Sequence, residues 1–168
     1  LNLMLMHRVV SARRDIMTPE EQIEWLESFV HQTVKAGKLI SMGWGNHSDE
    51  FTERTAGFGI VNLIVGGRVP YFRGLGYLDL ALDNGDGDEV VYPMGFAHMT
   101  RFNSFMNPLH GNKRMEQMHS HLFGHDRPIC REYITAHTHS PAFSTEGSLP
   151  NERTHFIKCG TFKTDDSY

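Results

Sequence analysis

Apolar residues recur at helical spacing between residues 19 and 36. The apolar stripe consists of Ile23, Trp25, Leu26, Phe29, Val30 and Val34. Thr18 is suited to the N-cap position, Pro19 to the first helical position and Gly37 to the position that ends a helix. The pattern therefore predicts a helix over 19–36 that packs through one face.

The rest of the pattern predicts a mixture of strands and helices. Apolar runs indicate strands at 38–43, 77–82, 89–98, 133–136 and 154–159, and helices are expected at 52–65 and 107–123. Asn-Gly and Asp-Gly steps between residues 83 and 88 predict a turn that joins two of these strands in a hairpin. Because strands and helices alternate in part and a hairpin is inserted, we expect an α/β or mixed α+β fold.

Composition narrows the class of protein. The chain has 168 residues, the size of one domain, and no linker-like segment marks a boundary within it. Its 16 Lys and Arg against 20 Asp and Glu give a net charge of 16 − 20 = −4, which disfavours electrostatic binding of nucleic acid as the main role. No apolar run approaches the roughly 20 residues of a membrane span. The two cysteines, Cys130 and Cys159, do not form a disulfide framework, so we expect a reducing, cytoplasmic compartment.

Histidines follow three of the predicted strands at the point where each strand ends. The chain has 11 histidines, more than a core needs. Gly45-Asn46-His47 follows the first predicted strand, His98 ends the second strand of the hairpin, and His137-Thr138-His139 follows the strand at 133–136. Imidazole nitrogen and amide oxygen are ligands for divalent ions such as Zn, Fe, Mn and Mg. Because ligands gather outside the carboxyl ends of strands, these segments predict a metal site assembled from distant parts of the chain.

In this order, Gly45-Asn46-His47, His98 and the His137-x-His139 pair resemble the later motifs of the calcineurin-like metallophosphoesterases. The resemblance extends from about residue 18 to the C-terminus, and the stretch 101–110 looks like members found in phages and prokaryotes. The segment 158–162 is similar to the strand and Gly-Ser/Thr turn that follow the family's His-x-His. The resemblance implies a four-layer sandwich of two mixed β-sheets packed face to face, with helices outside.

The resemblance also implies a role for each motif residue. Members of the family hold two divalent metal ions, bridged by a carboxylate and by a hydroxide that attacks the phosphate ester. By that likeness Asn46, His98 and His137 would ligate one ion and His139 the other. His47 would lie beside the scissile phosphate, where it would steady charge or protonate the leaving oxygen. The expected activity is hydrolysis of phosphate mono- or diesters with two ions, for which Mn is favoured over Fe, Zn and Mg.

Two departures from the family pattern bear on these expectations. Ser48 stands where the family has Asp or Glu after Gly-Asn-His, which affects the contacts that support the loop. The family's opening Asp-x-His and Gly-Asp-x-x-Asp motifs, which supply the bridging carboxylate and most ligands of the first ion, do not occur ahead of Gly45. They are expected to precede Leu1. We therefore expect a single metallophosphoesterase domain without its first strand or two, which by itself binds metal weakly and hydrolyses little.

The residues admit three other interpretations. A nuclease-type member of the family would act on nucleic acid, and a non-catalytic relative would keep the fold for binding. A cupin-like barrel would also use a His-x-His pair, but it needs a Glu three or four residues later, and Glu146 lies seven residues after His139. His110 is a rival for His98 because it also forms a His-Gly step, whereas His119 and His121 do not share a helix face.

Overall fold

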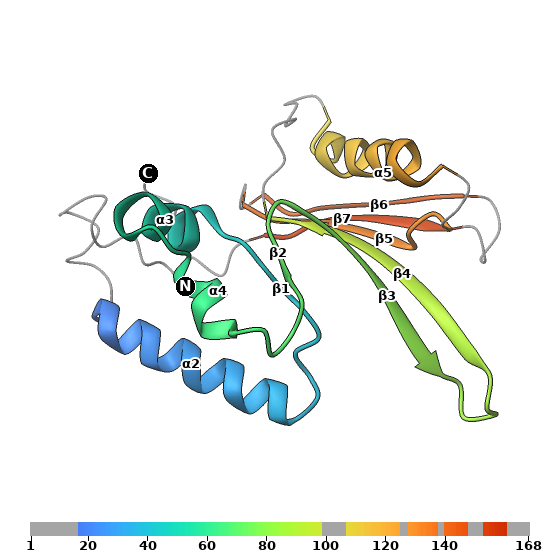
Figure 1. Cartoon of the computed structure of the whole chain (residues 1–168). Coiled ribbons are helices and arrows are strands. Elements are labelled where there is room, and N and C mark those ends of the chain that lie inside the picture. Colours follow the sequence, from blue (N-terminus) through green and yellow to red (C-terminus); the bar gives the residue numbers. More distant parts are fainter. Residues whose placement is uncertain (1–16, 99–106, 125–127, 138–139, 148–152, 161–168) are drawn as a thin grey trace. The chain divides into compact units, whose positions relative to one another are not determined.

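The computed structural model divides the chain into two compact units, Leu1–Arg73 and Gly74–Tyr168 (Figure 1). It describes residues 17–98, 107–124, 128–137, 140–147 and 153–160. Each unit has a hydrophobic core of its own. The single domain expected from the sequence stays a prediction.

Helix α2, Pro19–Lys35, begins with the cap that the sequence predicts. The Thr18 hydroxyl accepts a hydrogen bond from the Glu21 amide at 3.3 Å, and the Glu21 carboxylate accepts one from the Thr18 amide at 2.6 Å. This reciprocal pair satisfies two donors at the helix N-terminus that would otherwise lack a partner. The helix ends before Gly37, which has a φ of +65°. The predicted helix is therefore confirmed at both ends.

The buried face of α2 is narrower than the apolar pattern indicated. Leu26 and Val30 are buried in the core of the first unit. Trp25 and Phe29, which we expected to widen that face, are instead 51% and 41% exposed and stack on each other at 5.4 Å between ring centres. The reason is that the packing partner is the six-residue helix α4, Ile60–Val65, which covers only a narrow stripe.

The other elements of the first unit are short. They are β1 Met42–Gly43, the π-helical turn η2 Asn46–Glu50, α3 Phe51–Ala56, α4 and β2 Tyr71–Phe72. Strands β1 and β2 pair in parallel, and the buried side chains of α4 (Val61, Ile64 and Val65) pack in the same cluster as α2. This cluster is the hydrophobic core of the first unit, the unit that also contains the Gly-Asn-His loop.

Two sequence predictions for the first unit are wrong in part. The strand expected at 38–43 pairs only over Met42–Gly43, because its partner β2 is itself two residues long, and Ile40 is 49% exposed. The helix expected at 52–65 is divided into α3 and α4. The left-handed conformation of Gly57, with a φ of +81°, ends α3, and α4 starts anew after Gly59.

The second unit contains one five-stranded mixed sheet. Its strands are β3 Leu75–Asp83, β4 Glu89–Ala97, β5 Glu132–Thr135, β6 Ala142–Glu146 and β7 Thr154–Lys158, in the order β3-β4-β5-β7-β6. Strands β4, β5 and β7 are parallel, whereas β3 and β6 are antiparallel edge strands. The predicted hairpin and the predicted strands at 133–136 and 154–159 are confirmed. The edge strand β6 was not predicted.

Helix α5, His110–Phe123, covers one face of this sheet (Figure 1). The predicted helix began at 107, but Asn107 instead caps the turn before the helix, since its side-chain oxygen accepts a hydrogen bond from the Leu109 amide at 3.1 Å. Met115 of α5 is buried with Tyr133 of β5 and Phe156 of β7. The β4–α5–β5 connection therefore places α5 antiparallel to the strands, with its N-terminus at their carboxyl ends.

The opposite face of the sheet carries an apolar row. Phe96, Ile134, Ile157 and Phe143 are neighbours in register across four adjacent strands. Phe143 is 65% exposed, whereas the other three are partly buried. Parallel strands are normally covered on both faces. The apolar composition of this row is therefore typical of a face that packs against another element.

The expected fold class is confirmed at the level of a mixed α/β architecture, with a five-stranded mixed sheet, a two-stranded parallel sheet and helices. Among the described residues, no helix is both long enough and apolar enough to cross a membrane.

Candidate functional site

Two of the predicted metal ligands lie side by side at one rim of the second unit. His98 follows β4, and His137 follows β5 after one residue. The two strands are parallel neighbours in which Ala97 is opposite Thr135, so both strands end at the same level. The imidazole rings have centres 5.2 Å apart and planes inclined at 68°. The convergence at strand ends that we predicted from the sequence therefore holds for this pair.

The backbone at this rim is held by the last hydrogen bonds of the sheet. The Ala136 amide donates to the Ala97 carbonyl at 3.2 Å, and the Cys159 amide donates to the Thr135 carbonyl at 2.7 Å. His137 then adopts a φ of +83°, the only positive φ at a residue other than glycine in the described part of the chain. Such a conformation is costly for a residue with a Cβ, and conformations of this kind cluster at functional sites.

The spacing of the two rings fits a shared metal ion. An ion about 2.1 Å from a nitrogen of each ring lies about 3.2 Å from each ring centre, so two rings at a tetrahedral ligand angle have centres about 5.2 Å apart. That is the spacing of His98 and His137. Within the described ranges, no group of three or more His, Cys, Asp or Glu side chains could hold a metal ion. The described residues therefore bring two such side chains together at this rim, and not three.

The side chains of the other predicted ligands are not among those that the structure describes. Asn46 and His47 form the first residues of η2, in the first unit, and their side chains are outside the described part. His139 lies outside the described residues. The assignment of Asn46 and His139 as ligands, and of His47 beside the phosphate, stays a prediction.

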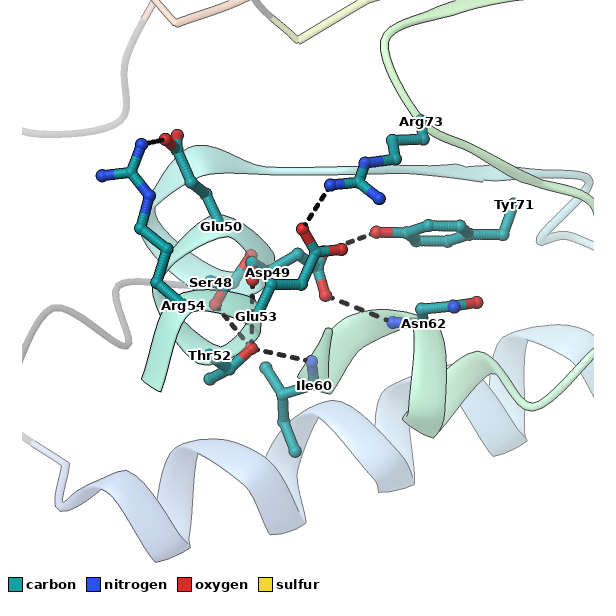
Figure 2. A network of polar contacts seen from close by, with 10 residues as sticks. All are labelled: Ser48, Asp49, Glu50, Thr52, Glu53, Arg54, Ile60, Asn62, Tyr71 and Arg73. Atoms are coloured by element: carbon teal, nitrogen blue, oxygen red, sulfur yellow. Dashed lines mark hydrogen bonds and ion pairs between the residues drawn. The ribbon is translucent and has the colours of Figure 1, made fainter. Parts of the chain in front are cut away.

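The loop that carries Asn46 and His47 is anchored by the buried carboxylate of Asp49 (Figure 2). Asp49 Oδ1 accepts hydrogen bonds from the amides of Val61 at 2.9 Å and Asn62 at 3.4 Å, and Oδ2 accepts one from the Tyr71 hydroxyl at 2.6 Å. The carboxylate thus caps the N-terminus of α4 from twelve residues away, where the residue in the cap position, Gly59, has no side chain.

Gly59 is needed for this arrangement. A Cβ at Gly59 would lie 2.6 Å from Asp49 Oδ1, closer than real Cβ contacts. Thr52 adds a second link, because its hydroxyl accepts a hydrogen bond from the Ile60 amide at 3.0 Å and donates to the Ser48 carbonyl at 3.0 Å. Thr52 and Asp49 together join η2 and α3 to the start of α4 (Figure 2), and Gly59 leaves the space that the Asp49 carboxylate occupies.

Charges surround this anchor at the surface. Arg73 forms an ion pair with Glu53 at 2.7 Å, and Arg54 forms one with Glu50 (Figure 2). Burial, together with the hydrogen bond to Asp49, raises the pKa of Tyr71 well above its ordinary value. The Tyr71 hydroxyl therefore remains a donor to Asp49 throughout the neutral pH range.

Sequence reasoning did not assign a role to Asp49. In the sequence, Ser48 occupies the position where the calcineurin-like metallophosphoesterases have an acidic residue. In the structure the acidic residue that supports the loop is the next one along, Asp49, which is fully buried. The signal was present as the Ser-Asp-Glu sequence after Gly-Asn-His, but its partners are supplied by α4 and β2 and could not be read locally.

The remaining histidines of interest lie on α5. His110 and His121 are exposed, whereas His119 is buried among Tyr77, Phe123 and Tyr133. The Tyr133 hydroxyl is 3.3 Å from His119 Nδ1. His119 is thus part of the aromatic core of the second unit, as one expects for a buried polar ring with a partner.

Comparison with protein-family models found no model that matches this chain. Comparison with the curated proteins gave no match, and comparison with the solved structures gave none either. The function of this chain must therefore be inferred from its own residues.

Proposed function

We propose that this chain belongs to a dinuclear-metal phosphoesterase of the calcineurin-like type, which hydrolyses phosphate mono- or diesters. The observation that carries the proposal is the His98–His137 pair. The sequence predicted that the segments at Asn46-His47, His98 and His137 would converge at one rim, and two of these side chains, His98 and His137, have rings 5.2 Å apart. Two imidazoles at that spacing are a suitable half of a site for Mn, Fe or Zn.

The proposed roles follow the motif residues. His98 and His137, with Asn46, would hold one ion, and His139 would help to hold the second. When bound, the two ions would neutralise phosphate charge and lower the pKa of a water molecule. His47 would hold a proton for the leaving oxygen, a task for which imidazole is well suited near neutral pH.

Two further observations support the proposal. The buried Asp49 carboxylate supplies the support for the Gly-Asn-His loop that the family's acidic residue would otherwise provide. The apolar row Phe96–Ile134–Ile157–Phe143 gives the five-stranded sheet a face on which a second sheet could pack, as in a four-layer sandwich.

Metal binding by the 168-residue chain is the direct test. Mn²⁺ added to the protein is followed by electron paramagnetic resonance, which reports the free ion. Replacing His98 or His137 with Ala is expected to weaken binding at least about tenfold, since each change removes a ligand. The matched control is His121→Ala, which removes an exposed histidine of the same unit. Equal Mn²⁺ affinity in all four proteins would contradict the proposal.

Hydrolysis is measured separately with p-nitrophenyl phosphate and bis(p-nitrophenyl) phosphate in the presence of Mn²⁺. Activity is expected to be low in the 168 residues, in which the Asp-x-His and Gly-Asp-x-x-Asp motifs do not occur. His47→Ala is expected to abolish it. Metal binding without any hydrolysis would favour a non-catalytic, binding relative.

A further inference from the structure

A buried lysine lies at the same rim of the second unit. Lys158 is the last residue of β7 and is only 8% exposed. Alternation along β7 places it on the same face as the buried Phe156, which packs with Met115 of α5. Its cross-strand neighbour on β5 is Thr135. The Lys158 side chain therefore emerges on the face of the sheet that α5 covers, at the level where the parallel strands end.

Lys158 has no counter-ion in the described part of the chain. The ion pairs there join Arg54 to Glu50, Arg73 to Glu53 and Lys113 to Glu146, and no described acceptor bonds to the Lys158 amino group. Among the described residues, Trp44 Nε1 is the one side-chain polar atom that is both fully buried and without a hydrogen-bond partner. The Lys158 ammonium is therefore not fully buried, and the 8% exposure of this residue includes its charged end. The aliphatic stem is buried and the charge reaches the surface.

The first turn of α5 lies beside this lysine. The Thr135 hydroxyl donates to Asn112 Oδ1 at 2.9 Å, and Asn112 Nδ2 donates to the Ile157 carbonyl at 2.7 Å, which fixes the start of the helix next to the end of β7. Figure 1 shows the N-terminal end of α5 over the carboxyl ends of the parallel strands. The N-terminal end of α5 and the Lys158 side chain thus lie on the same face of the sheet, at the end where the parallel strands finish, and the helix dipole makes that end of α5 positive.

Two backbone donors of this turn have no acceptor among the described residues. The Leu109 and His110 amides are satisfied by the side chain and the carbonyl of Asn107. The next two amides, of Gly111 and Asn112, have no such partner, although both residues are buried. These are amides that the first turn of any helix leaves without an intrahelical partner, so they are available to an acceptor from outside the helix.

We propose that Lys158 and the first turn of α5 bind a phosphate group at the carboxyl-end rim of the sheet. A tetrahedral oxyanion can accept from two adjacent amides and from an ammonium at once, and its charge is favoured by the helix dipole. The phosphate comes either from an organic ester or from free phosphate. This site uses none of the proposed metal ligands, so it stands independently of the phosphoesterase proposal.

Phosphate binding by the full chain in excess chelator tests the proposal. Binding of inorganic phosphate, measured by calorimetry, is expected to weaken about tenfold in Lys158→Met, which keeps the apolar stem and removes the charge. Lys158→Arg is expected to retain binding, and Lys38→Met, at an exposed lysine of the first unit, is the matched control. No binding by the wild type, or equal binding by Lys158→Met, would overturn the proposal.

A second measurement uses the unaltered protein. In ¹⁵N-labelled chain, the Gly111 amide resonance is expected to shift on titration with inorganic phosphate and to remain unmoved with chloride at equal ionic strength. A Gly111 resonance that phosphate does not move would also overturn the site. Phenyl phosphate in place of inorganic phosphate separates the two sources: a shift of equal size identifies an ester site, and a shift with inorganic phosphate alone identifies a free-phosphate site.

Discussion

The Tyr71 hydroxyl donates a 2.6 Å hydrogen bond to the buried carboxylate of Asp49, and this contact joins strand β2 to the Gly-Asn-His loop. The same carboxylate caps α4 through the Val61 amide. One side chain thus connects three elements that are separated along the sequence. The geometry of the loop depends on it, which makes Asp49 the clearest target for mutation in the first unit.

Replacing Asp49 with Ala is expected to destabilise the first unit by about 3 kcal/mol, because it leaves a buried amide and a partly buried hydroxyl without an acceptor. Both tryptophans, Trp25 and Trp44, lie in this unit, so urea unfolding followed by tryptophan fluorescence reports it selectively. Glu53→Ala, which removes only a surface ion pair with Arg73, is the control and is expected to cost below about 1 kcal/mol. A larger effect of Glu53→Ala than of Asp49→Ala would disprove the anchoring role.

Gly59→Ala is expected to cost about 2 kcal/mol in the wild-type background, because the new methyl group would lie against Asp49 Oδ1. The backbone is not the cause, since Gly59 has a φ of −85°, which alanine adopts readily. In an Asp49→Ala background the obstacle is absent, so the same substitution should cost less. The double-mutant cycle in urea measures this coupling, and strict additivity of the two changes would refute the contact.

Asn112 is expected to be the most sensitive polar residue of α5. Its amide nitrogen donates to the Tyr133 and Ile157 carbonyls, both at 2.7 Å, and its oxygen accepts from Thr135. Asn112→Ala should cost about 2–3 kcal/mol, and Asn112→Asp should cost more because a carboxylate would face two carbonyl oxygens. The loss of stability is measured by hydrogen exchange of the β5 and β7 amides.

The control for that experiment is Gln117→Ala on the exposed side of the same helix, which is expected to change exchange rates little. Equal protection of the strands in the Asn112 and Gln117 variants would mean that α5 is held by its apolar contacts alone.

The second unit is expected to lose stability at alkaline pH. Burial raises the pKa of Tyr77 to about 12, and its hydroxyl donates to the Met115 carbonyl at 3.2 Å. Because the folded-state pKa lies above the unfolded value near 10, this group contributes fully below pH 10 and its contribution is lost as pH rises towards 12. The expected loss is about 1–2 kcal/mol after allowance for the partial exposure of the ring.

Urea midpoints between pH 9 and pH 11.5, followed by circular dichroism, measure this slope. Tyr77→Phe lowers stability at neutral pH by removing the hydrogen bond, but it should flatten the alkaline decline. Tyr133, whose pKa burial also raises, contributes in the same direction, so some slope remains in the variant. An unchanged slope in Tyr77→Phe would contradict the assignment.

Elements with strong local signals were predictable from the sequence. The cap of α2 is formed by Thr18 and Glu21, three residues apart, and the β3–β4 hairpin is specified by the turn between its strands. The strands that end at His98 and His137 are apolar runs whose length is typical of strands and too short for most helices. The expectation that these two histidines converge came from the family resemblance and from the rule that ligands gather outside the ends of strands.

Elements that depend on distant partners were not predictable. The division of residues 52–65 into α3 and α4 is made by Gly57 together with a cap from Asp49. Strand β1 is short because β2 is short, and Trp25 remains exposed because α4 covers little of α2. Each outcome depends on what packs against the segment, which the local pattern does not contain.

The sequence by itself determined the mixed α/β class, the hairpin and the main helix, because each follows from local periodicity or turn chemistry. Only the tertiary structure decided which polar groups are buried and what they contact. Asp49 and Asn112 became anchors, and Lys158 is buried without a counter-ion among the described residues, because burial is a property of the packed elements and not of the residue type.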